Sequence, residues 1–188
     1  MKVKLWILGG LVVGTLSCAR EPSDGMKRTQ DLTDALFAAI SANREAYARH
    51  VVNRLQYEER LLVATEHFRE EKALPLPAQM LRMSAEEVAK TTNGQFAYSL
   101  ISLWPVNKQN GARTESEKSG LRAIAETGKN HYTEEVLGGE KYFVAYYPDR
   151  GVVEACVKCH NDHKDSPRKD FRVGDVMGGV VIRVKMAR

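Results

Sequence analysis

The amino-acid sequence predicts an α+β domain built around an antiparallel sheet. Two predicted helices come first, and three segments rich in aromatic and aliphatic residues follow, with one more helix between them. Strands surrounded by helices in this mixed order indicate an antiparallel sheet flanked by helices. The 188 residues, of which 43% are hydrophobic and 28% are charged, suit one globular domain with a sizeable core.

The first eighteen residues, MKVKLWILGGLVVGTLSC, are organised like an export signal. Lys2 and Lys4 precede an apolar run at residues 5–13, and small residues then lead to Cys18. The run is too short to span a bilayer, and a polar linker follows at residues 19–30, so a permanent transmembrane helix is the weaker interpretation. We therefore expect the folded part to lie outside the cytoplasm, in the periplasm or the cell envelope.

Cys18 is a candidate site of lipidation. Leu16, Ser17 and Cys18 resemble the end of a bacterial lipobox, although Thr15 stands where that motif prefers an aliphatic residue. In the alternative interpretations, Cys18 is discarded with a cleaved signal or remains in an uncleaved anchor. A lipid anchor is the one membrane contact that we expect.

The charge balance indicates no polyanionic partner. Residues 1–18 contain two lysines and no acidic residue, so their removal changes 28 basic and 24 acidic residues to 26 and 24, a net charge of +2. No basic stripe is interleaved with aromatic residues, as it would be in a nucleic-acid-binding protein.

A long helix is predicted at residues 31–72, with a break near Leu62 as an alternative. Its apolar residues recur at intervals that keep them on one helical face. They are Leu36, Ile40, Tyr47, Val51, Leu55 and Leu62. Pro75 and Pro77 end the helix before them, because proline lacks the backbone donor and forces its predecessor towards extended geometry. A second, short helix is predicted at residues 78–90.

The predicted strands lie at residues 96–105, 141–148 and 178–186, which are rich in aromatic and aliphatic side chains. On the last strand, Val180, Ile182 and Val184 share one face. Between the first two strands, Thr114 and Glu117 have the spacing of a capping box and open a helix that Gly128 ends.

Two cysteines and a histidine form the pentapeptide Cys156-Val157-Lys158-Cys159-His160, the C-x-x-C-H signature of c-type haem attachment. Two thiols at this spacing can add to the two vinyl groups of one porphyrin, and the histidine that follows supplies an axial nitrogen to the iron. We therefore predict one covalently attached haem c per chain, with Cys156 and Cys159 as tethers and His160 as proximal ligand.

Two other readings of the cluster are a zinc site and a redox dithiol. Zinc needs four ligands, so His163 or Asp162 would have to complete a cramped set. A redox dithiol has no use for His160, and it normally follows a strand in a parallel βαβ unit, a context that this chain lacks. The full pentapeptide in an exported chain favours haem over both.

Residues 146–184, YYPDRGVVEACVKCHNDHKDSPRKDFRVGDVMGGVVIRV, resemble the end of the PAS-like haem c domains, a family long catalogued as a domain of unknown function. Its members include a cyanobacterial lumenal haem protein and extracytoplasmic sensor modules of bacterial receptors. The likeness covers about residues 40–185. The block after the cysteines is more discriminating than C-x-x-C-H alone; it comprises Asn161, Asp165, Ser166, Pro167, Asp170, Gly174, Asp175 and Gly178.

The resemblance implies a PAS-like antiparallel sheet flanked by a long N-terminal helix, with haem between sheet and helices, in a domain at residues 31–188. It also implies the same tether and axial roles for Cys156, Cys159 and His160. Independently of the resemblance, we expect residues 161–175 to form a tight loop with a structural role, because Ser166 and Pro167 favour a turn and Gly174 permits unusual backbone angles.

The sixth iron ligand is left open. Some relatives use a distal cysteine, and this chain has none there, since Cys18 belongs to the export region. The candidate donors are His67, Met80 and His50, followed by His131 and Met83, and for each of them core packing or surface exposure is the competing interpretation.

Two functions follow from this reading, an electron-transfer cytochrome and a sensor. The first works with a redox partner, and it is favoured by our expectation that the chain has no output domain of its own. The second detects redox state or a diatomic gas (NO, CO) and acts through a membrane signalling protein. A peroxidase-like enzyme would need a polar distal pocket, and we expect no catalytic activity.

Overall fold

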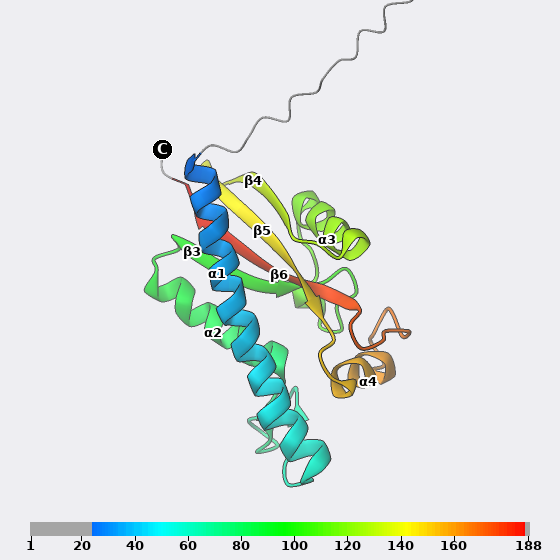
Figure 1. Cartoon of the computed structure of the whole chain (residues 1–188). Coiled ribbons are helices and arrows are strands. Elements are labelled where there is room, and N and C mark those ends of the chain that lie inside the picture. Colours follow the sequence, from blue (N-terminus) through cyan, green and yellow to red (C-terminus); the bar gives the residue numbers. More distant parts are fainter. Residues whose placement is uncertain (1–23, 187–188) are drawn as a thin grey trace, which may run out of the picture.

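The computed structural model describes residues 24–186, and the predicted export signal with Cys18 lies outside them. Within this part, no helix is both long and apolar enough to cross a membrane. The elements follow one another along the chain as shown in Figure 1: α1 (Asp24–Ala46), η1 (Tyr47–Glu58), β1 (Ala64–Thr65), β2 (Leu74–Pro75), α2 (Pro77–Thr91), β3 (Phe96–Ile101), η2 (Lys108–Asn110), α3 (Glu115–Thr127), β4 (His131–Leu137), β5 (Glu140–Arg150), α4 (Glu154–Asp162) and β6 (Val176–Lys185).

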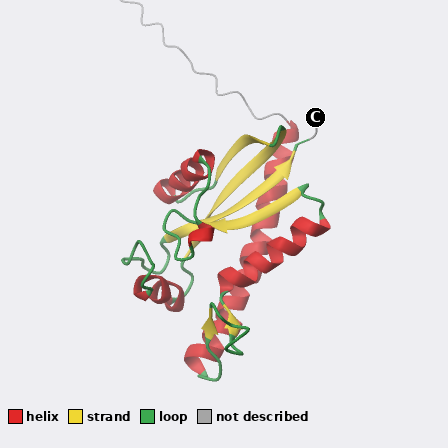
Figure 2. Cartoon of the chain, turned by 180° about the vertical axis from the view of Figure 1, so that it is seen from behind, coloured by secondary structure: helices red, strands yellow, loops and turns green. Residues whose placement is uncertain are grey.

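Four strands form an antiparallel sheet in the order β3-β6-β5-β4. Helices α1 and α2 cover one face, α3 covers the other, and α4 lies beyond one end of the strands (Figures 1 and 2). This architecture confirms the predicted α+β class with a long N-terminal helix.

Both faces of strand β5 are buried. Successive side chains of a strand point to opposite sides, so neighbouring residues of β5 belong to two different cores. Phe143 and Tyr147 belong to the core beneath α1 and α2, whereas Val144 and Tyr146 belong to the core beneath α3, and each is at most 1% exposed. The predicted shared face of the last strand is also confirmed, since Val180, Ile182 and Val184 all pack towards α1 and α2.

Helix α1 is fixed to the sheet by an aromatic stack and by hydrogen bonds. The rings of Phe37 and Tyr147 are parallel within 6°, with centroids 4.2 Å apart. The hydroxyls of Tyr132 and Tyr147 each donate to the carboxylate of Asp34 at 2.8 Å. Burial raises the pKa of Tyr147, so its hydroxyl remains a donor.

Helix α3 begins and ends as predicted. The Thr114 side chain accepts a hydrogen bond from the Glu117 backbone N–H at 3.1 Å, and the Glu117 carboxylate accepts one from the Thr114 N–H at 3.3 Å. Gly128 ends the helix in the left-handed conformation, with φ +66°. At Gly120 the helix lies so close to the sheet that a Cβ would stand 2.5 Å from the Tyr146 ring.

The expected helix at residues 31–72 is wrong at both ends, whereas the alternative of a break near Leu62 agrees with its end at Glu58. The helical chain begins at Asp24, continues as a π-helix over η1 and ends at Glu58. Residues 59–76 are irregular, with a short parallel pairing of β1 with β2 and left-handed conformations at Arg60 and Lys72. Apolar spacing predicts a helix only where burial stabilises it, and the next apolar residues, at 61–63, are exposed here.

The sequence reading missed β4 and made β3 too long. β4 is an edge strand with mostly polar residues, HYTEEVL, so it lacks the apolar alternation that marks a strand. Its turn into β5 uses Gly138 and Gly139, both at positive φ, which is typical of a two-residue hairpin. Strand β3 ends at Ile101, four residues before the predicted end.

Candidate functional site

Helix α4 carries the predicted site residues on one face. Cys156, Cys159 and His160 are spaced i, i+3 and i+4, so their side chains are neighbours on the helix surface. Both thiols are free, with Cys156 half-buried and Cys159 exposed, and Lys158 is exposed as expected. The structure therefore brings the two thiols and the imidazole together.

Helix α4 is held in place by a small apolar cluster, separate from the two main cores. Val157 is 3% exposed and packs against Phe171 and Met177, with Trp104 beside them. The Arg168 guanidinium lies 4.9 Å from the Trp104 ring centroid and 4.3 Å from that of Phe171, a cation–π arrangement that covers the cluster. The helix is thus anchored through the residue between the two cysteines.

The loop after α4 returns to the helix through hydrogen bonds. The Asn161 side-chain amide donates to the Phe171 carbonyl at 2.9 Å, and the Phe171 N–H donates to the Asn161 carbonyl oxygen at 3.0 Å. Ser166 is buried, and its hydroxyl donates to the Arg168 carbonyl at 2.7 Å. Gly174 adopts φ +93°, as expected for this loop. These contacts give the segment a structural role.

The His160 imidazole is half-buried and is free to coordinate a metal ion. It packs edge-on against Phe171, with ring centroids 6.1 Å apart, and its Nδ1 is buried without a hydrogen-bond partner among the described residues. Burial lowers the pKa of His160, and the charges of Arg44 and His163 lower it further. The ring is therefore neutral near pH 7 and keeps a lone pair that a metal can accept.

The C-terminal part of η1 and the loop after it lie near the two thiols. Burial raises the pKa of Tyr57, and the charges of Cys159 and Cys156 add to the increase. Although Cys159 is exposed as a residue, partial desolvation of its sulfur raises the pKa of the thiol, and the charges of Cys156, Asp162 and Glu66 add to the increase. The Cys159 thiol is thus protonated near pH 7, unlike the acidic thiols of redox dithiol motifs.

Helices η1 and α2 and the loop between them expose five large apolar side chains. The Gln79 side chain donates to the Glu66 carbonyl at 2.8 Å, which joins the start of α2 to this loop. We call these exposed residues the outer apolar surface: Tyr57, Leu61, Leu62, Val63 and Met80. They are between 42% and 67% exposed.

The zinc reading gains no support from the site. Among residues 24–186, no group of three or more histidine, cysteine and acidic side chains is arranged to hold a metal ion. His163, the suggested fourth ligand, accepts a hydrogen bond at Nδ1 from the Asp165 backbone N–H at 3.1 Å.

The structure places none of the candidate sixth ligands against His160, whose one described ring contact is with Phe171. His50 and His67 are exposed, and Met80 is 42% exposed. Met83 is half-buried on α2, and the His131 ring lies 6.0 Å from the ring of Tyr146 on the sheet. His67 follows Glu66, which is close enough to Cys159 to influence the pKa of its thiol. The identity of the sixth ligand stays a prediction.

Sequence reasoning missed two features of the site. One is the buried ion pair between Arg44 of α1 and Asp149 of β5, which lies near His160. The other is Tyr57 of η1, which is close enough to both cysteines for their charges to raise its pKa. The sequence could have suggested Asp149 as a neighbour of the site, because it lies only seven residues before Cys156. Nothing in the local sequence marks Arg44 or Tyr57.

Fold and site together define an α+β domain that presents a C-x-x-C-H motif on a peripheral helix. The chain belongs to the Tll0287-like family, whose sequence model matches residues 24–185. A similar solved structure is that of the cyanobacterial heme protein Tll0287, at 14% sequence identity and a TM-score of 0.46, covering 60% of this chain and 74% of that one. No curated protein sequence matches the chain.

Proposed function

We propose that the chain is an exported c-type haem protein that carries one haem. Cys156 and Cys159 form thioether bonds to it, and His160 is the proximal iron ligand. Family membership supports haem binding, since the protein that gives the family its name is a haem protein. The observation that carries the assignment is the face of α4, where two free thiols stand beside an imidazole with no competing partner.

The residues of α4 fit this cofactor chemically. Addition of a thiol to a vinyl group transfers the S–H hydrogen to the carbon, so it consumes no oxidant and needs both cysteines reduced, as they are here. The neutral His160 ring offers a nitrogen to the iron. A bound haem supplies an iron that cycles between the ferrous and ferric states.

We propose electron transfer as the function of this haem. Helix α4 lies at the periphery of the fold (Figure 1), and Cys159 is exposed, so a cofactor tethered there lies near the surface and within reach of a redox partner. No catalytic reaction is part of the proposal. Export to the periplasm or cell envelope, with lipidation of Cys18 as an option, rests on the sequence of residues 1–18.

Sensing of redox state or of a diatomic gas is the second candidate. The exposure of His50, His67 and Met80 favours it, because none of these side chains is packed in place as a sixth ligand. A vacant sixth position can take up NO or CO, and a membrane signalling partner would then read the resulting change.

Optical spectra of the purified protein in both redox states distinguish the two functions. Electron transfer predicts a six-coordinate, low-spin haem that carbon monoxide does not alter. A high-spin spectrum that shifts on addition of carbon monoxide would contradict it and support sensing. His67→Ala and Met80→Ala, measured alongside, identify the sixth ligand as the residue whose loss converts low-spin to high-spin haem.

A further inference from the structure

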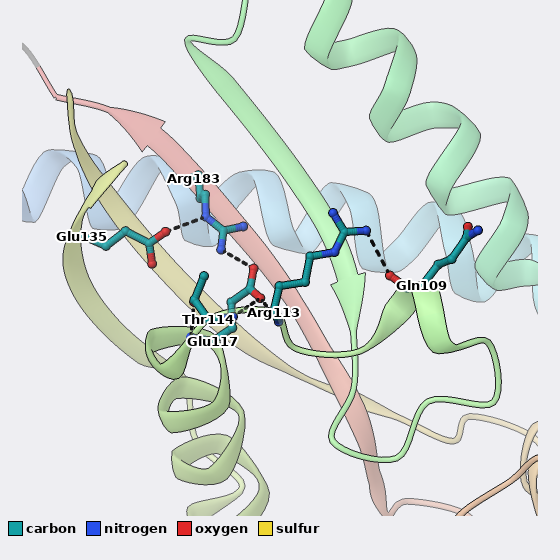
Figure 3. Close-up of polar contacts among 6 residues, drawn as sticks. All are labelled: Gln109, Arg113, Thr114, Glu117, Glu135 and Arg183. Atoms are coloured by element: carbon teal, nitrogen blue, oxygen red, sulfur yellow. Dashed lines mark hydrogen bonds and ion pairs between the residues drawn. The ribbon is translucent and has the colours of Figure 1, made fainter. Parts of the chain in front are cut away.

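The buried nitrogen of His160 differs from the other buried polar atoms that lack a hydrogen bond. Five such atoms occur in the described part of the chain, and two of them belong to charged groups that are paired through other atoms. The Arg44 guanidinium donates twice to Asp149. The Glu135 carboxylate accepts from Arg183 at 3.3 Å (Figure 3). The His160 ring, in contrast, has no hydrogen bond to any described residue through either nitrogen.

The Phe171 ring forms the wall against which this imidazole packs. The two rings meet edge-on at 85°, with centroids 6.1 Å apart, and Phe171 is only 4% exposed. Because Nδ1 is buried, Nε2 is the nitrogen left for the iron, and Nδ1 then carries the hydrogen. A histidine that binds a metal normally donates this hydrogen to a carboxylate, a carbonyl or a water. The phenyl ring of Phe171 offers no oxygen or nitrogen to accept it.

Phe171 is itself held on several sides. The side chain of Asn161, the residue after His160, makes two hydrogen bonds to the Phe171 backbone, at 2.9 and 3.0 Å. The Trp104 ring packs edge-on against the Phe171 ring, with centroids 5.8 Å apart. The Arg168 guanidinium lies 4.3 Å from the Phe171 centroid. Since Asn161 and His160 are consecutive on α4, these contacts hold the wall and the ligand in one fixed relationship.

The charged groups that influence His160 do not supply the missing acceptor. Arg44 is one of them, and its Nε is also buried without a partner, but this atom is a donor, as Nδ1–H is. The Asp149 carboxylate accepts from both terminal nitrogens of Arg44, at 2.5 and 3.2 Å. His163 is the other group, and its Nδ1 accepts from the Asp165 backbone N–H at 3.1 Å.

We propose that Phe171 is a positioning residue for the iron ligand, which fixes the plane of the His160 imidazole and keeps the hydrogen on Nδ1 without an acceptor. The inference rests on the proposed function, because it concerns the haem that His160 binds. A histidine that donates from Nδ1 is a more basic ligand and stabilises ferric over ferrous iron. Without such an acceptor, the reduction potential is higher than it would be with an acceptor beside Nδ1.

The test uses the full-length protein with its haem attached. Spectroelectrochemistry gives the reduction potential, and electron paramagnetic resonance of the ferric protein gives the g values, which depend on the orientation of the imidazole plane. Phe171→Gln offers an amide carbonyl to Nδ1 and should lower the potential. Phe171→Leu removes the ring and adds no acceptor, so it should shift or broaden the resonance signal while the potential stays above that of Phe171→Gln.

Met177→Ala is the matched control for the loss of packing. Met177 is 6% exposed and belongs to the same apolar cluster as Phe171, so the variant creates a cavity there and leaves the ring contact of His160 in place. It should lower the thermal midpoint and retain the wild-type potential and g values. Arg44 and His163 are unchanged in all three variants, so their charges cannot cause the differences.

Three results would overturn the proposal. An unchanged potential in folded, haem-loaded Phe171→Gln would show that Nδ1 already has an acceptor, such as a buried water. Wild-type g values in Phe171→Leu, or equal changes in Met177→Ala, would show that Phe171 contributes packing alone. The comparison of these two variants decides the positioning role even where Phe171→Gln fails to fold. Wild-type protein without attached haem would instead overturn the proposed function, and this inference with it.

Discussion

Arg44 and Asp149 form a buried, two-pronged ion pair that joins α1 to the end of β5. The two guanidinium N–H groups donate to the two carboxylate oxygens at 2.5 and 3.2 Å, and the side chains are only 14% and 10% exposed. The pair lies beside the site, since the charge of Arg44 lowers the pKa of His160. The ion pair therefore ties the long helix α1 to the end of β5, the strand that leads into α4.

Removal of one member of this pair should destabilise the protein strongly. Arg44→Ala leaves the Asp149 carboxylate buried without its counter-charge, which costs about 3 kcal/mol in the free energy of unfolding. Urea titration followed by circular dichroism measures the loss. The double variant Arg44→Met with Asp149→Leu should recover most of it, because no charge is then left buried. A single variant as stable as the wild type would contradict this account of the ion pair.

Gly120 is predicted to be essential for the packing of α3. Gly120→Ala places a Cβ 2.5 Å from the Tyr146 ring, so the free energy of unfolding should fall by about 1–3 kcal/mol. The control is Gly25→Ala on α1, where no heavy atom lies within 4 Å and alanine should stabilise the helix by up to about 1 kcal/mol. Equal thermal midpoints for the two variants would show that α3 tolerates the side chain.

The Asn161 side chain should hold the loop after the motif. Asn161→Ala removes two hydrogen bonds and leaves the N–H and carbonyl of Phe171 without their partner, at an expected cost of about 1–3 kcal/mol. Amide hydrogen exchange at Phe171 should accelerate in the variant. Asn43→Ala, on the exposed face of α1, serves as the control and should change stability by less than about 0.5 kcal/mol. Unchanged exchange at Phe171 would contradict the role of Asn161.

The pKa of Cys159 gives a test of the thiol environment in haem-free protein. Because partial desolvation and the neighbouring acidic groups raise this pKa, the folded chain holds less thiolate at pH 8 than the unfolded chain does. Iodoacetamide should therefore modify Cys159 more slowly in buffer than in urea, and the ratio should approach one as the pH rises above the folded-state pKa. Peptide mass spectrometry measures both rates, and circular dichroism checks that the haem-free chain is folded. Faster modification in buffer would contradict the predicted environment.

The sequence predicts the parts of the fold that local chemistry decides. The Thr114–Glu117 capping box, the Gly128 terminus and the apolar face of β6 depend on neighbouring residues and were predicted correctly. The end of the long helix at Glu58 and the polar edge strand β4 were not, because both depend on which surfaces the folded chain buries.

The candidate site also combines features that the local sequence predicts with features that only the tertiary fold creates. The side-by-side placement of Cys156, Cys159 and His160 follows from their spacing once they lie on a helix. Tyr57 and Arg44 reach the site from about a hundred residues away in the sequence, and only the tertiary fold brings them there.

The attachment of haem to the two cysteines is the central claim, and the mass of the intact protein tests it most directly. Protein from the cell envelope of a host with a working cytochrome c maturation system should carry the mass of one haem that survives denaturation, with a pyridine haemochrome band typical of two thioether bonds. Cys159→Ser should shift that band to the one-thioether position or lose the haem. Colourless wild-type protein without the added mass, or a two-thioether band in Cys159→Ser, would contradict the account.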